Sequence, residues 1–290
     1  MKNLKKLSIL LFTFFILTGC KNTKSNMEDI NIYTTTYPIN FLINNLYEEH
    51  CKVYSIYPTG ISLDDYELSD RKLEEYSKSD LIVFNSLDKK DINYAAKMIN
   101  LNSKLKTINA ADEMPDYEHS IEETWLNPNN YLKMADNIKK GLSNYIDNPY
   151  LVEEIEEKFE TLEYEISKLD ANLTETIINA NHKTIVVDHD MFKFLEKRGL
   201  RVISLEENND LSNNKIDEVK NLIEEKKIKY IYSATKDTNN TINNLINEYK
   251  IERIVLNTMH SIDGGITNSN DNYLTIMTNN INELKKELYK

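Results

Sequence analysis

Residues 148–179 read NPYLVEEIEEKFETLEYEISKLDANLTETIIN, and this stretch decides the fold. It begins with Asn148, a residue type that caps helix N-termini, and Pro149, which suits the first helical position. Apolar residues then recur at alternating spacings of four, three and four: Leu151, Ile155, Phe159, Leu162, Ile166, Leu169 and Leu173. This period predicts one apolar stripe along a helix of about 28 residues, roughly 42 Å long. Such a helix is too long for one compact domain, so we predict a strut between two lobes.

Short apolar or β-branched runs alternate with helical patterns on both sides of this helix. The runs that predict strands are 29–36, 52–57, 81–84 and 105–108 before it, and 184–187, 201–205, 229–232 and 253–256 after it. Alternation of this kind is typical of parallel sheets flanked by helices. We therefore predict an α/β fold with an N-terminal lobe (30–147), the connecting helix (148–179) and a C-terminal lobe (180–290). A ligand cleft is expected between the lobes.

The N-terminus carries a targeting signal. Three lysines within the first six residues precede Leu7–Leu17, an apolar run of 11 residues, which is too short to span a bilayer and typical of a signal peptide. The sequence Leu17-Thr18-Gly19-Cys20 resembles a bacterial lipobox. The resemblance implies a signal peptide (1–19), a lipidated Cys20 with a flexible tether (20–29), and anchoring at the extracytoplasmic face of the cell membrane. The alternative is a plain secretory signal with a chance cysteine.

Composition narrows the classes of function. The net charge is −12, and becomes −15 without residues 1–19, which disfavours nucleic acid and anionic lipid as partners. Cys51 is the only cysteine besides Cys20 and is expected to be buried. The six glycines form no phosphate-binding loop, and GxSxG, CxxC and HExxH are all absent. We expect neither an enzyme nor an organic cofactor.

Polar side chains that could bind a ligand follow the predicted strands. They lie in PTGISLDDYE (58–67), EETWLNP (122–128), DHD (188–190) and NTMHS (257–261). In parallel sheets, ligands bind beyond the carboxyl ends of the strands. Two imidazoles and two carboxylates from these four loops can form a four-coordinate site for a divalent metal.

From about Ile30 onward the chain resembles the zinc and manganese solute-binding lipoproteins of bacterial ABC transporters, the cluster A-I family. That family places its ligands in segments similar to P-x-G-x-x-P-H-x-Y-E, D-P-H-x-W-L-x-P, H-D-A-F and D-S-I or D-S-L. The matching positions here are Asp64, Glu123, His189 and His260. The resemblance implies a monomeric, non-enzymatic receptor that captures zinc or manganese and passes it to an ABC permease. Iron is also compatible with mixed nitrogen and oxygen ligands.

The matching positions depart from the family pattern in a compensating way. Acids replace both histidines of the first lobe, and His260 replaces the usual acid of the last position. All four residues can still ligate, which favours a retained metal site. The alternative is a lost or repurposed site, in a binding or adhesion lipoprotein that needs no metal. Asp64 could also be a helix-capping or exposed acid, and Glu123 a solvated charge. His189 could be a helix-capping residue, and His260 an ordinary loop imidazole. We expect Asp190 to be a helix N-terminal acid and Trp125 to pack beneath the cleft.

Overall fold

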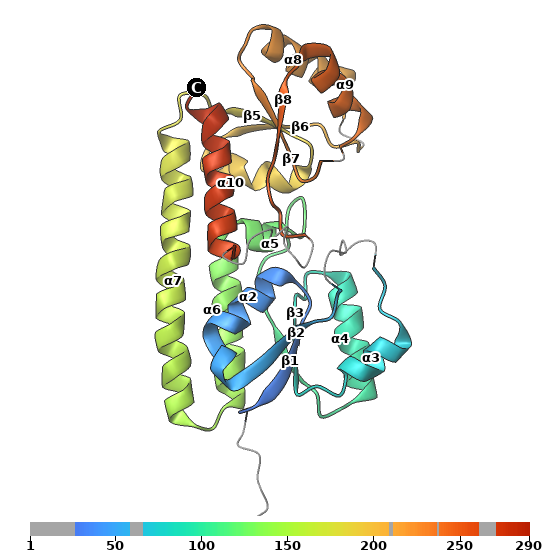
Figure 1. The fold of residues 1–290 in the computed structure, drawn as a ribbon, viewed down its shortest axis with the longest axis vertical. Helices are drawn as coiled ribbons and strands as arrows, with labels where there is room; N and C mark the ends of the chain where they lie inside the picture. Colours follow the sequence, from blue (N-terminus) through green and yellow to red (C-terminus); the bar gives the residue numbers. More distant parts are fainter. Residues whose placement is uncertain (1–26, 59–65, 209–210, 237, 261–270) are drawn as a thin grey trace, which may run out of the picture.

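The computed structural model describes residues 27–58, 66–208, 211–236, 238–260 and 271–290. Two parallel four-stranded sheets lie in separate lobes beside a long helix (Figure 1). This arrangement confirms the predicted α/β fold with one sheet in each lobe. The predicted signal peptide, Cys20 and Asp64 lie outside the described residues.

The N-terminal lobe is built around a sheet with strand order β2-β1-β3-β4, in which every pair is parallel. Its elements are β1 (Ile30–Thr34), α2 (Tyr37–Tyr47), η2 (Glu48–His50), β2 (Cys51–Ser55), α3 (Asp70–Tyr76), β3 (Leu81–Phe84), α4 (Lys89–Leu101), β4 (Lys106–Asn109), α5 (Glu123–Leu126) and α6 (Pro128–Tyr145). The four predicted strands are all present within one or two residues of their predicted ends. The turn of helix α5 was predicted as loop.

The C-terminal lobe repeats the same strand order, β6-β5-β7-β8, again with parallel pairs only. Its elements are β5 (Thr184–Val187), η3 (Asp190–Arg198), β6 (Arg201–Ser204), α8 (Asn213–Glu224), β7 (Tyr230–Ser233), α9 (Asn240–Tyr249), β8 (Glu252–Val255) and α10 (Tyr273–Leu288). The segment η3 is a 3-10 helix. Apolar side chains from α8 and α9, such as Val219, Ile242 and Leu245, cover one face of this sheet.

The long helix α7 (Pro149–Ile178) begins and ends within one residue of its prediction. The side chain of Asn148 accepts a hydrogen bond from the backbone N–H of Tyr150, as expected of an N-terminal cap. All seven residues of the predicted stripe are buried. They pack against α2 and α6 of the N-terminal lobe and against α10, and they belong to one core that includes both lobes. The stripe therefore provides the apolar surface along which the lobes are joined.

Helix α10 is a second connection between the lobes and runs beside α7 (Figure 1). At its start, the ring of Tyr273 stacks on Tyr131 of α6, with ring centroids 3.7 Å apart. At its end, the buried carboxylate of Glu287 accepts hydrogen bonds from the backbone N–H groups of Lys229 (3.0 Å) and Tyr230 (2.9 Å). One helix thus fixes the N-terminal core to β7 of the C-terminal sheet.

Each lobe has a buried aspartate at the carboxyl ends of its two central strands, the point at which the strand order of the sheet reverses. In the N-terminal lobe this is Asp91, whose carboxylate accepts hydrogen bonds from the Thr35 hydroxyl and from the backbone N–H of Asn85. Thr35 follows β1 and Asn85 follows β3, so Asp91 joins the ends of the two central strands. Burial raises the pKa of Asp91 to about 8, and the charge of Asp88 adds to this rise.

Gly199 ends η3 with φ +98°, in the left-handed region that favours glycine after the end of a helix. A Cβ atom at this position would meet nothing within 4 Å. Gly199→Ala should therefore lower the free energy of unfolding by about 1–2 kcal/mol through backbone strain alone. Urea unfolding measures this loss. Lys250→Gly, at the left-handed residue that ends α9 (φ 55°), serves as the control. Relief of strain and added chain entropy oppose each other there, so a change below about 1 kcal/mol is expected. An unchanged stability for Gly199→Ala would contradict the strain argument.

Candidate metal centre between the lobes

Three of the four predicted ligands lie in the described part of the chain, each beyond the carboxyl end of a strand. Glu123 opens α5 after β4, His189 follows β5 and His260 follows β8. Asp64 belongs to residues 59–65, outside the described ranges. The segments after β4 and β8 meet between the lobes, because Trp125 Nε1 donates a hydrogen bond of 2.9 Å to the carbonyl oxygen of Thr258. Trp125 itself is buried.

Glu123 is buried, and its carboxylate is engaged by its own chain. Oε1 accepts hydrogen bonds from the backbone N–H groups of His119 (3.0 Å) and Ser120 (3.4 Å). These bonds hold the turn that leads into α5. Glu123 is therefore buried and hydrogen-bonded within its own segment, and it is not the solvated charge that was the alternative to a metal ligand.

The neighbouring residue Glu122 contacts the other lobe. Its Oε1 lies 2.7 Å from Nδ1 of His260, and its other oxygen accepts a hydrogen bond from the Ser120 hydroxyl. Glu122 is almost fully buried, whereas the His260 side chain is 24% exposed. Burial alone would raise the pKa of Glu122, but the bonds from His260 and Ser120 outweigh burial, so its pKa lies below the ordinary value. A buried carboxylate and an imidazole from opposite lobes are therefore already in contact.

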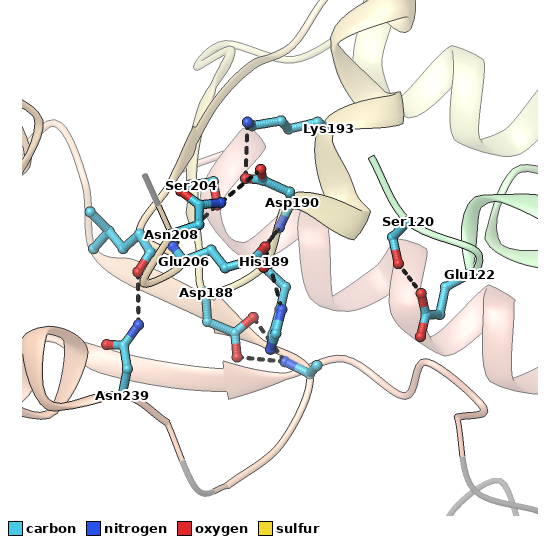
Figure 2. A network of polar contacts seen from close by, with 12 residues as sticks. Ser120, Glu122, Asp188, His189, Asp190, Lys193, Ser204, Glu206, Asn208 and Asn239 are labelled. Atoms are coloured by element: carbon cyan, nitrogen blue, oxygen red, sulfur yellow. Dashed lines mark hydrogen bonds and ion pairs between the residues drawn. The ribbon is translucent and has the colours of Figure 1, made fainter. Parts of the chain in front are cut away.

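His189 lies at the start of η3 with 47% of its side chain exposed (Figure 2). Its Nδ1 is 3.5 Å from Oε2 of Glu206, and the same oxygen accepts a 2.6 Å hydrogen bond from the backbone N–H of Asp190. Glu206 therefore caps η3 and lies beside the imidazole. This accessible imidazole can still offer its Nε2 atom to a ligand.

The two aspartates that flank His189 have structural partners (Figure 2). Asp188 is buried and accepts hydrogen bonds from the backbone N–H of Ala234, so it joins the ends of β5 and β7 as Asp91 does in the other lobe. Burial raises the pKa of Asp188 to about 6, although the charge of His189 opposes the rise. Asp190 pairs with Lys193 at 2.9 Å, in the first turn of η3 where a helix N-terminal acid was predicted.

Further contacts hold the two lobes in register around these residues. Arg198 of η3 pairs with Asp170 of α7 at 2.5 Å and donates a 2.9 Å hydrogen bond to the Asn127 side chain before α6. The Tyr273 hydroxyl of α10 donates to the carbonyl oxygen of Trp125 at 2.7 Å. The segment that carries Glu122 and Glu123 is thus held by α10 directly, and by α7 through Arg198 of η3.

The predicted ligands are not assembled into one tight cluster. Within the described ranges, the ligand atoms of Glu123, His189 and His260 do not all lie within 4.8 Å of one another. One group of three that meets this distance is present, formed by Glu49, His50 and Glu154 at the far end of α7. Lys158 lies 2.6 Å from Glu154 and 3.6 Å from Glu49, so a cation of the protein already balances this group.

Sequence reasoning missed Glu122 and Glu206, the two carboxylates that contact His260 and His189. Glu122 stands beside Glu123 in the sequence EETWLNP, so the segment was identified but the contacting residue was not. Glu206 follows β6 and belongs to no motif of the quoted segments. Its position at the carboxyl end of a strand next to β5 was the available signal.

No helix in the described part of the chain has both the length and the apolarity needed to cross a membrane.

Comparison with known proteins identifies the family. The chain matches the family described as ZnuA, zinc-uptake complex component A, periplasmic, over residues 32–287. The zinc-binding lipoprotein AdcA of Streptococcus pneumoniae strain R6 is 25% identical over 309 residues, covering 98% of this chain. The chain spans only 61% of the length of AdcA.

Solved structures share the fold. The crystal structure of the zinc-bound ZnuA-like domain of S. pneumoniae AdcA has a TM-score of 0.73 at 23% identity, covering 90% of this chain and 100% of that domain. The laminin-binding protein Lbp of Streptococcus pyogenes has a TM-score of 0.70 at 18% identity, covering 90% and 99%. At these identities the solved structures establish that the fold is shared. They do not by themselves establish what this chain binds. Because the family match extends over residues 32–287, the chain belongs to the ZnuA family.

Proposed function

We propose that this chain is an extracytoplasmic solute-binding lipoprotein, anchored through Cys20, that captures a divalent transition metal and delivers it to an ABC permease. The proposal depends chiefly on the contact between His260 of the C-terminal lobe and a buried carboxylate beside α5 in the N-terminal lobe. Imidazole and carboxylate are both ligands of zinc and manganese. Family membership and the zinc-binding relative AdcA support zinc as the first metal to test.

The ligands predicted from the sequence are Asp64, Glu123, His189 and His260. We propose that the two histidines bind the metal together with Asp64 and one acid at the start of α5, in a monomer. The accessible imidazole of His189 and the interlobe imidazole of His260 supply nitrogen, and the two acids supply oxygen. Protons compete with the metal for the imidazoles, so capture is expected to weaken as pH falls.

Titration of residues 21–290 with Zn²⁺ and Mn²⁺ tests this function. We expect the unmodified chain to bind at least one of the two ions. His189→Ala and His260→Ala should each weaken binding by more than about 100-fold, since loss of a ligand exceeds the 10–100-fold cost of losing a group that only orients one. His182→Ala, a histidine next to β5 outside the four segments, is the control and should leave binding unchanged.

The titration also separates the proposal from its alternative. Absence of binding to either ion would contradict metal capture and favour a metal-independent binding or adhesion lipoprotein on the same scaffold. Binding that survives both histidine variants would show that the ion sits elsewhere, for example at Glu49, His50 and Glu154.

A further inference from the structure

We infer that Glu122, rather than Glu123, is the carboxylate of the N-terminal lobe that binds the metal together with His260. This inference rests on the proposed function and refines its site. Glu122 and Glu123 are adjacent at the start of α5, where successive side chains point about 100° apart. Only one of the two can therefore face His260.

The carboxylate of Glu123 is hydrogen-bonded to the turn before α5. Its Oε1 holds the backbone N–H groups of both His119 and Ser120. Pulling this oxygen toward a metal would break the two backbone hydrogen bonds that hold the turn before α5. Glu123 thus has a structural reason to be an acid or amide without binding any ion.

The contacts of Glu122 leave its interlobe oxygen available to a metal. The Ser120 hydroxyl holds one carboxylate oxygen, so the group has a defined orientation. The other oxygen, Oε1, points to Nδ1 of His260 at 2.7 Å. The carboxylate is already nearly fully buried, so most of its desolvation has been completed before any ion arrives.

The distance between the two groups is close to what one shared ion requires. With Zn–N and Zn–O bonds of about 2.0–2.2 Å and a tetrahedral angle, two ligand atoms lie about 3.4 Å apart. Glu122 Oε1 and His260 Nδ1 are 2.7 Å apart, so these two atoms need to move apart by less than about 1 Å to make room for the ion. Such a change needs side-chain rotation only. The metal would lie between the carboxylate oxygen and the imidazole nitrogen.

A pair of matched variants tests the assignment. Glu122→Gln and Glu123→Gln are neighbours with the same change of charge, and in the second variant the new side-chain amide oxygen can still accept the two backbone bonds. Zn²⁺ affinity of residues 21–290 is measured by competition with a chromophoric chelator. We expect Glu122→Gln to weaken affinity by more than about 100-fold and Glu123→Gln by less than about threefold.

Co²⁺ spectroscopy separates a ligand from a residue that merely orients His260. The visible absorption of bound Co²⁺ depends on its ligands, so Glu122→Gln should alter the spectrum at saturating metal while Glu123→Gln should not. Thermal unfolding of the metal-free variants checks that both fold like the unmodified chain. An unchanged spectrum for Glu122→Gln, or equal losses of affinity in both variants, would overturn the assignment. The reverse pattern would make Glu123 the ligand and leave the proposed function intact. A lack of Zn²⁺ and Mn²⁺ binding by the unmodified chain would instead overturn the function itself.

Discussion

Ile166→Ala is expected to lower the free energy of unfolding by about 2–5 kcal/mol. Ile166 lies in the apolar stripe of α7 and is fully buried in the core that includes both lobes. Removing its branched side chain leaves a cavity that flanking helices can fill only in part, because α7 is held on one side by α6 and on another by α10. Urea unfolding followed by circular dichroism measures the change as a lower midpoint with an unchanged slope.

Tyr164→Ala provides the matched control for this substitution. Tyr164 is two residues away on the same helix, but it is 65% exposed. Its truncation should change stability by less than about 0.5 kcal/mol, the usual range for surface positions. If both variants lost the same stability, burial of the stripe would not explain the effect, and helix propensity could not explain it either, because alanine has the higher propensity.

Asp91→Asn is expected to remove a large part of the pH dependence of stability. The folded-state pKa of Asp91 is raised by burial to about 8, whereas an unfolded aspartate titrates near its ordinary value. The folded state therefore holds a proton that the unfolded state has lost, and the contribution of this group to stability falls as pH rises from about 4 to about 8. Asparagine is neutral throughout, and its amide oxygen can accept the bonds from Thr35 and Asn85. The variant should match the unmodified chain near pH 4 and exceed its stability by a few kcal/mol near pH 8.

Chemical unfolding at several pH values between about 4.5 and 8 measures this difference. Asp188 also has a raised pKa, but it is present in both chains and cancels in the comparison. Asp70→Asn, at the exposed first residue of α3, is the control and should leave the pH profile in place. Parallel profiles for Asp91→Asn and the unmodified chain would show that Asp91 is ionised when buried.

The fold could be predicted because its signals are local. The stripe of α7 and the apolar runs of the eight strands follow from the spacing of side chains along the chain, and the structure confirms them. The bridging role of α10 could not be predicted in this way. It depends on contacts between Tyr273 and Tyr131 and between Glu287 and β7, which lie far apart in the sequence.

The sequence predicted which segments meet at the candidate site, but not which side chains within them make the contacts. Residues at the ends of parallel strands were expected to meet, and the segments after β4 and β8 do meet. Which of two adjacent acids faces His260 depends on the single turn of α5, a feature too short to leave a periodic pattern. The 3-10 geometry of η3 was hidden for the same reason, because nine residues with mixed polarity do not distinguish it from an α-helix. The four-ligand set itself stays a prediction.

The place of α10 in the chain has a consequence for how the protein matures. Every other described element precedes α10, yet its side chains cover part of the α7 stripe and join the cores of both lobes. A chain that emerges N-terminus first therefore exposes part of this apolar stripe until α10 has been synthesised. Termination within α10 would yield two nearly complete lobes with an uncovered seam, a form prone to proteolysis and aggregation. The integrity of the seam between the lobes thus depends on α10.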